Sequence, residues 1–203
     1  MKRLFANCLN LLLIVGLGLG LGGCVTTKLP TASFSPWEEV ELETTANPLD
    51  IAFSDASHGF LIGTNRLILE TKDGGKTWSE RKLDLPDEEN FRLISIDFQG
   101  DEGWLAGQPG LVMHTTDAGK NWTRLVLGSK LPGEPYLINT LARDSAELAT
   151  TAGAVYQTNN AGNSWEGKVN DASGGVRDMR RDKNGDYVSV SSLGNFFATL
   201  EKD

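Results

Sequence analysis

The sequence predicts an all-β protein built from repeated four-stranded units, and two observations carry this prediction. First, the eight-residue segment 71–78 returns as 115–122 and 158–165, so that its closing tryptophans lie 44 and 43 residues apart. Second, apolar residues between these segments alternate with polar or small ones, which is the period of a half-buried β-strand. A repeat of roughly 40 to 45 residues is the size of one four-stranded blade of a β-propeller.

The repeated segment has the chemistry of a tight turn that satisfies its own hydrogen bonds. An Asp or Asn side chain can accept bonds from nearby backbone N–H groups, and the glycine two positions later can adopt a positive φ. The hydroxyl or amide before each tryptophan can add a bond, and the indole can fill the apolar layer between strands. The segment resembles the Asp-box turn of bacterial neuraminidases, which predicts a structural role rather than a catalytic one. The residues concerned are Asp73, Gly75, Trp78, Asp117, Gly119, Trp122, Asn160, Gly162 and Trp165.

The chain begins with a pattern that is typical of an export signal. Lys2 and Arg3 precede an apolar run over residues 9–21, and the run ends in the letters LGGC at Cys24. This ending resembles a bacterial lipobox, in which the cysteine becomes the lipidated first residue of the mature protein. We therefore predict that residues 1–23 are a signal peptide and that Cys24 carries the lipid. A retained transmembrane helix is the alternative, and the glycines of the run disfavour it.

Charge and cysteine content exclude several classes of function. The chain has 203 residues, enough for a domain with a real core, and 27 acidic against 19 basic residues give it a net charge of −8. This acidic balance argues against a general nucleic-acid binder. Cys8 and Cys24, the two cysteines, both precede the repeats. Disulfides, thiol catalysis and cysteine-based metal sites are therefore excluded from the repeat region.

Residues 24–36 are rich in Thr, Ser and Pro without an apolar period, and we predict a tether there. Residues 37–42 match the strand that follows each Asp-box, so we expect the propeller domain, 37–203, to begin on an outermost strand. Each complete unit then has an alternating inner strand, a second strand bounded by glycines, a third strand that leads into the Asp-box and a fourth that begins at its tryptophan. The first inner strand should contain the alternating residues Leu49, Ile51 and Phe53.

The fourth unit is incomplete in the sequence. It begins near Val176 and reaches residues 196–199, and the chain ends at Asp203 before another Asp-box. We thus predict a partial propeller of about four blades, with three complete units and three strands of a fourth. The strand at 37–42 could complete the fourth blade and close a ring of four, or the units could form an open arc of a larger ring. We favour the open arc, and the sequence resembles a truncated form.

The lipobox, the tether, the Asp-box units and the stretches 131–138 and 186–191 together resemble the cyanobacterial photosystem II stability/assembly factor family. The resemblance implies a seven-bladed propeller that is anchored by lipid to the thylakoid membrane on its lumenal side. It also implies a non-enzymatic protein without a cofactor. Its partner would be the newly made reaction-centre core subunit of photosystem II, including the precursor whose C-terminal tail is processed.

The family is further associated with a patch of arginines on the propeller. In the fourth unit, arginines occupy an inner strand whose counterparts carry alternating apolar residues, and clustered guanidinium groups can hold carboxylates in bidentate fashion. The predicted partner-binding residues are Arg177, Arg180, Arg181 and, as a further member, Arg143. An internal salt network is the alternative, and its acids would be Asp178, Asp182 and Asp186.

Other candidate sites are weaker. Residues 182–186 resemble the start of a calcium loop but lack its bidentate glutamate, so we predict a hairpin turn with Asn184 and Gly185 at the tip. His58 and His114, the two histidines, share no metal-ligand spacing, and we predict no metal site.

Two other functions compete with the assembly-factor hypothesis. One is a generic lipid-anchored binding propeller for a peptide or a carbohydrate. The other is a sialidase-like glycoside hydrolase, because Asp-boxes occur in sialidases. A sialidase needs a Tyr nucleophile with a supporting Glu, but Tyr156 precedes an Asp-box on an outer strand, and Tyr136 and Tyr187 have no paired glutamate at a comparable place. A glycosidase with two carboxylates would instead use Asp97 and Glu102. We therefore expect that the protein is not an enzyme.

Overall fold

The computed structural model describes residues 38–86, 88–127, 131–169, 175–191 and 196–199. Residues from Val40 onward form one compact unit, which contains all the strands described below. The predicted signal peptide, Cys24, the tether and Trp37 lie outside the described residues. Regular structure in the described part of the chain is β-strand, and no helix there is long and apolar enough to cross a membrane.

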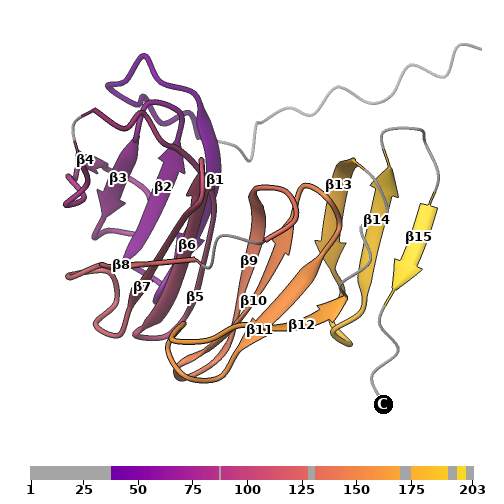
Figure 1. Cartoon of the computed structure of the whole chain (residues 1–203). Helices are drawn as coiled ribbons and strands as arrows, with labels where there is room; N and C mark the ends of the chain where they lie inside the picture. The colour runs from indigo at the N-terminus through magenta and orange to yellow at the C-terminus, as the bar shows by residue number, and fades with distance from the viewer. Residues whose placement is uncertain (1–37, 87, 128–130, 170–174, 192–195, 200–203) are drawn as a thin grey trace, which may run out of the picture. The chain divides into compact units, whose positions relative to one another are not determined.

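The first two units fold as predicted into four-stranded antiparallel sheets, which we call blades 1 and 2 (Figure 1). In each blade the strands pair in chain order, from the inner strand to the outer one. Blade 1 contains β1 (Pro48–Phe53), β2 (Gly59–Gly63), β3 (Ile68–Thr71) and β4 (Ser79–Glu80), and blade 2 contains β5 (Arg92–Gln99), β6 (Glu102–Gln108), β7 (Leu111–Thr115) and β8 (Thr123–Leu125).

The third and fourth units continue this pattern as blades 3 and 4. Blade 3 is again four-stranded, whereas blade 4 has three strands among the described residues. Blade 3 contains β9 (Pro135–Ala142), β10 (Ser145–Thr150), β11 (Val155–Thr158) and β12 (Glu166–Val169), and blade 4 contains β13 (Val176–Arg181), β14 (Tyr187–Ser191) and β15 (Phe196–Thr199). The partial propeller with about four blades is therefore confirmed.

The prediction of an outermost strand at residues 37–42 is wrong for the residues that the structure describes. Residues 38–44 form no strand; instead, Leu42 and Ala46 pack against a cluster of leucines on the free face of blade 1, beside Trp78. The segment buries apolar side chains on this face and does not pair with a strand edge. No described segment supplies a fourth strand to blade 4, so the strand exchange that would close a ring of four is absent from the described residues.

The hydrophobic core lies between successive blades. One cluster joins blades 1 and 2, a second joins blades 2 and 3, and a third joins blades 3 and 4. The Asp-box tryptophans contribute to the first two clusters. Trp122 of blade 2 contacts the ring of Phe60 of blade 1 edge-on at 6.3 Å between centroids, and Trp165 of blade 3 contacts Trp104 of blade 2 in the same way at 5.8 Å. Each indole thus fills the layer between its own blade and the preceding one.

The Asp-box glycines of blades 2 and 3 are required for two separate reasons. Gly119 has a φ of +79° and Gly162 a φ of +77°, a conformation that residues with a Cβ rarely adopt. In addition, a Cβ at Gly119 would lie 2.5 Å from ring carbons of Phe60, and a Cβ at Gly162 would overlap Leu125. The turn therefore brings its backbone into direct contact with side chains of the preceding blade.

We predict that Gly119→Ala destabilises the protein by about 1 to 3 kcal/mol more than Gly100→Ala does, because overlap in a packed core carries a cost of this size. Gly100 is a matched control, since it also has a positive φ, +62°, but no atom lies within 4 Å of the place that a Cβ would take. Urea denaturation of both variants measures the difference. Equal loss of stability in the two variants would show that backbone conformation alone, without packing on Phe60, requires the glycine.

Candidate functional site

The acid or amide of each Asp-box holds its own turn through hydrogen bonds. In blade 1, the hydroxyl of Thr71 donates to Asp73 Oδ1 at 2.8 Å and accepts the N–H of Gly75 at 2.9 Å. Asp73 also accepts the backbone N–H of Thr77 at 2.9 Å and its hydroxyl at 2.6 Å. Equivalent bonds join Asp117 to Asn121 in blade 2 and Asn160 to Ser164 in blade 3. This geometry favours the structural role predicted for the motif.

The bonds to Asp73 stabilise its ionised form. The side-chain hydroxyl of Thr77 has the largest effect, followed by the Thr77 backbone N–H and the Thr71 hydroxyl, and together they lower the Asp73 pKa to about 2. Blade 3 builds the same turn without a charge, because the amide of Asn160 donates from Nδ2 to the Ser164 hydroxyl at 2.8 Å. The charge at Asp73 is therefore not needed to form the turn.

We predict that Asp73→Asn keeps the fold at neutral pH and reduces the loss of stability at acid pH. Because the pKa of Asp73 is depressed in the folded state, its contribution is present above the unfolded value of about 3.9 and is lost as the pH falls toward 2. The difference in Tm between wild type and variant should therefore shrink from pH 5 to pH 2. Asn160→Asp, the reverse exchange in blade 3, should add such a dependence. A Tm difference that stays constant with pH would contradict this prediction.

Each histidine pairs with a mostly buried glutamate of its own blade. The histidine comes before the glutamate in blade 1 and after it in blade 2. His58, in the turn before β2, bonds Glu70 at 2.8 Å, and His114 on β7 bonds Glu102 on β6 at 2.6 Å. Burial opposes ionisation of Glu70, but the bond from His58 and the charge of Arg81 outweigh it and lower the pKa of Glu70. The sequence held a signal for these pairs that was missed, because histidine and glutamate lie twelve residues apart in both units.

Glu102, His114 and Asp144 form the one group of possible metal ligands in the described part of the chain, with one ligand atom of each within 4.8 Å of the others. Glu102 Oε1 is already engaged by three donors. It accepts His114 Nε2, Trp104 Nε1 at 3.1 Å and the backbone N–H of Asp144 at 2.9 Å. This arrangement favours a hydrogen-bonded corner between blades 2 and 3 rather than a metal centre.

The carboxylates considered for a hydrolase are likewise used to join blades. Asp97 Oδ2 accepts the backbone N–H of Thr140 at 2.6 Å, and the Thr140 hydroxyl donates to the carbonyl of Asp97. Burial raises the pKa of Asp97. Tyr187 donates its hydroxyl to Glu147 at 3.0 Å, and burial together with the Glu147 charge raises the pKa of this phenol far above neutrality. Neither Asp97, Glu102 nor Tyr187 therefore has the free, poised group that hydrolysis requires.

The structure separates the predicted arginines into two classes. Arg181 faces blade 3, where its Nε donates to Glu147 at 2.7 Å, and its side chain is 23% exposed. Arg180 points to the opposite face of β13, 85% exposed, with Asp178 at 3.6 Å. Arg177 lies at a shift in the pairing of β13 with β14 and is exposed. Arg143 follows β9 and is 88% exposed, 3.9 Å from Asp144.

The internal salt network considered from the sequence is thus present in part. Asp178 pairs with Arg180, as that alternative proposed, but the partner of Arg181 is Glu147 and not Asp182 or Asp186. Asp182 instead accepts the backbone N–H groups of Asn184 and Asp186 at the tip of the β13–β14 hairpin. The hairpin turn predicted there is confirmed, with Gly185 at a φ of +95°.

We predict that Arg181→Ala lowers the free energy of unfolding by about 1 to 3 kcal/mol, because it leaves the mostly buried Glu147 carboxylate with the Tyr187 hydroxyl as its remaining bond. Arg180→Ala should change stability by less than about 0.5 kcal/mol, since its ion pair is exposed to water. Thermal and urea denaturation of the two variants test this contrast. Equal effects would contradict the division into an internal and an exposed arginine.

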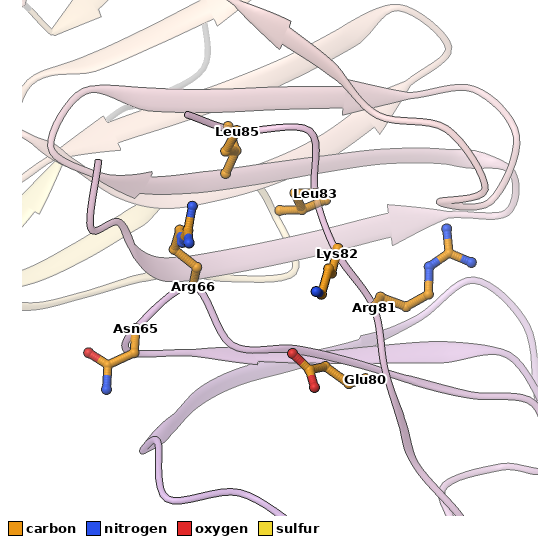
Figure 2. A pocket seen from close by; sticks show the side chains of 7 residues that line it. All are labelled: Asn65, Arg66, Glu80, Arg81, Lys82, Leu83 and Leu85. Carbon is orange, nitrogen blue, oxygen red and sulfur yellow. The ribbon is translucent and has the colours of Figure 1, made fainter. Parts of the chain in front are cut away.

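A cavity of about 160 Å³ lies beside the β2–β3 turn and is lined by Arg66, Arg81 and Lys82 (Figure 2). Two of these cations already have partners: Arg81 bonds Glu70 and the carbonyl of Lys120, and Arg66 bonds the carbonyl of Pro86. Arg66 has a φ of +60° at a position, twelve residues before the tryptophan, where blades 2 and 3 have glycine. Asn65 beside it has a φ of +55°, and the Leu67 N–H bonds the Thr64 carbonyl at 3.0 Å, so the left-handed conformation belongs to the hairpin turn between β2 and β3.

A larger cavity, of about 450 Å³, lies where the inner strands of the four blades converge. Its lining combines apolar side chains with Arg92 and Tyr136, neither of which the sequence had singled out for binding. Leu49, Arg92 and Tyr136 each stand near the beginning of an inner strand, β1, β5 or β9. This equivalent position in three repeats is the one feature of the sequence that could have indicated the site.

Comparison with known proteins places this geometry in a family. The family model described as "Photosynthesis system II assembly factor YCF48" matches residues 29–203. The "Photosystem II assembly lipoprotein Ycf48" of Synechococcus sp. (strain CC9605) is 69% identical over 201 residues, which is 99% of this chain and 60% of that protein. The chain thus spans about 60% of the length of the curated relatives that it matches.

Two solved structures have the same fold as the described blades. One is "YCF48 bound to D1 peptide", with 44% sequence identity, a TM-score of 0.78, and coverage of 81% of this chain and 53% of that chain. The other is "YCF48 from Cyanidioschyzon merolae", with 38% identity, a TM-score of 0.79, and coverage of 82% and 57%. Both similarities extend over blades rather than over a single motif.

Proposed function

The chain belongs to the YCF48 family of photosystem II assembly factors, and from this premise we propose that it is a non-enzymatic assembly factor that binds the newly made D1 reaction-centre subunit and its precursor. The observation that carries the proposal is the 44% identical relative that was solved with a bound D1 peptide. We place the protein on the lumenal side of the thylakoid membrane, held by a lipid on Cys24. The lipobox at that residue and the word "lipoprotein" in the names of the relatives support the anchor.

The exposed arginines of the inner strands are the proposed contacts for the partner. Arg177 and Arg180 project from β13 into solvent, and the weak pair with Asp178 leaves Arg180 able to exchange partners. Guanidinium groups bind carboxylates through paired hydrogen bonds, so an acidic or C-terminal stretch suits them. Arg143 extends the set. Arg181 belongs to it as a positioning residue, because its bond to Glu147 fixes the end of β13 against blade 3.

A non-enzymatic role agrees with how the polar residues of the blades are used. Asp73, Asp97 and Glu102 each accept hydrogen bonds that hold a turn or join two blades. Such residues stabilise the scaffold and have their carboxylates occupied by these bonds. The proposed function therefore rests on a surface presented by a rigid scaffold.

We predict that Arg177→Glu combined with Arg180→Glu weakens binding to a D1 C-terminal peptide by tenfold or more, because two attractive charge pairs become repulsive. Isothermal titration with the whole chain purified in detergent measures the affinity. Lys82→Glu, which also reverses an exposed cation, is the control and should bind as the wild type does. Unchanged affinity in the double variant would remove these arginines from the interaction. Absence of binding by the wild type would overturn the proposed function itself.

A further inference from the structure

The cavity of about 450 Å³ between the inner strands has a size within the roughly 300 to 1,000 Å³ of typical ligand pockets. It receives residues from β1, β5, β9 and β13, so four blades contribute to a single site. Some polar side chains of its lining bond neighbouring blades, and others have no partner among the described residues and are available to a ligand.

Most polar groups of the lining already have partners. Asp50 accepts the N–H of Ile51 through Oδ1 and the N–H of Ile96 through Oδ2, each at 2.9 Å. Ser95 accepts the N–H of Ile138 at 3.2 Å, and Gln108 donates to the carbonyl of Pro135 at 2.9 Å. The bonds to Ile96, Ile138 and Pro135 tie blade 1 to blade 2 and blade 2 to blade 3. They fix the walls of the cavity, because the same side chains that line it hold the inner strands in register.

Two polar groups are left for a ligand. Arg92, at the start of β5, is exposed, and its guanidinium forms no hydrogen bond or ion pair with any of the residues that the structure describes. The hydroxyl of Tyr136, at the start of β9, forms no hydrogen bond within those residues either. Burial and the charge of Asp178 raise the pKa of Tyr136, whereas the charge of Arg180 lowers it.

The hydroxyl of Thr151 accepts the N–H of Glu134 at 3.0 Å and is therefore also paired, and the remaining lining is apolar. Leu49 is 41% exposed, whereas Met179 is 5% exposed and closes one wall. Ile94 and Leu137 are partly buried. An apolar side chain that enters from outside would remove this surface from water, which is the main favourable contribution to binding in such pockets.

We propose that this cavity binds the end of a peptide chain, with the terminal carboxylate on Arg92 and an apolar side chain of the last residues against Leu49 and Met179. Within the described residues the site has one unpaired cation, in a protein whose net charge is −8, and it is too small for a folded partner. The hydroxyl of Tyr136 is placed to bond the backbone of the same peptide. This inference rests on the proposed function, since it names the part of the partner that the inner strands receive.

The test compares a synthetic D1 C-terminal peptide with a free carboxylate and the same peptide with a C-terminal amide, by isothermal titration on the whole chain in detergent. We expect Arg92→Ala to weaken binding of the free-acid peptide about tenfold and to leave binding of the amide peptide nearly unchanged. Leu49→Glu should weaken both peptides, because it places a charge in the apolar part of the site. Lys82→Ala removes an exposed cation elsewhere and should change neither affinity.

The outcomes separate this inference from the proposed function. If Arg92→Ala and Leu49→Glu bind the free-acid peptide as the wild type does, while the Arg177 and Arg180 variant does not, the cavity is not the site and the proposed function stands. A wild type that binds free-acid and amide peptides equally well overturns the role of the terminal carboxylate. If the wild type binds neither peptide, both the proposed function and this subsite are overturned. Tyr136→Phe, which removes only the hydroxyl, should weaken both peptides by a few-fold.

Discussion

The close approach of the Asp-boxes of blades 2 and 3 to the preceding blade is the constraint on which the other features depend. At Gly119 the backbone touches the ring of Phe60, and at Gly162 it touches Leu125 and Trp104. No residue with a side chain satisfies both the positive φ and this contact. The acid or amide of the motif keeps the turn in that shape through its bonds to the backbone, and the indole then closes the gap between the blades.

Hydrogen bonds between inner strands add a second, polar link between the blades. Asp50 reaches Ile96 of the next blade, and Asp97 reaches Thr140 of the one after it. Buried carboxylates that accept backbone N–H groups are well satisfied, so they stabilise the arrangement and are poor candidates for chemistry. Residues whose type suggests catalysis are thereby explained as parts of the scaffold. Side chains that have no partner among the described residues, such as Arg92, are therefore the better candidates for contacts with a ligand.

The repeats differ in sequence where a side chain of one blade makes a contact that the other blades lack. Arg66 occupies a left-handed position that blades 2 and 3 give to Gly110 and Gly153, and its side chain holds the loop that leads into blade 2. On β13, arginines replace the apolar residues of earlier inner strands, and the alternation of side chains sends Arg180 to solvent and Arg181 to Glu147. A single run of basic residues thus contains both a surface contact and an internal support.

The sequence by itself determined the strand order, the Asp-box turns and the hairpin tip at Gly185, because each depends on residues a few positions apart. The tertiary structure decided what lies across the blades. The Asp-box chemistry could not reveal that Arg181 binds Glu147, 34 residues away, or that Leu42 packs on a sheet face and does not form a strand. It also could not reveal that Leu49, Ile51 and Phe53 alternate as an inner strand should and yet remain about two-fifths exposed or more. Burial and ion pairing depend on which faces meet, and that is set by register and packing between distant segments, not by local pattern.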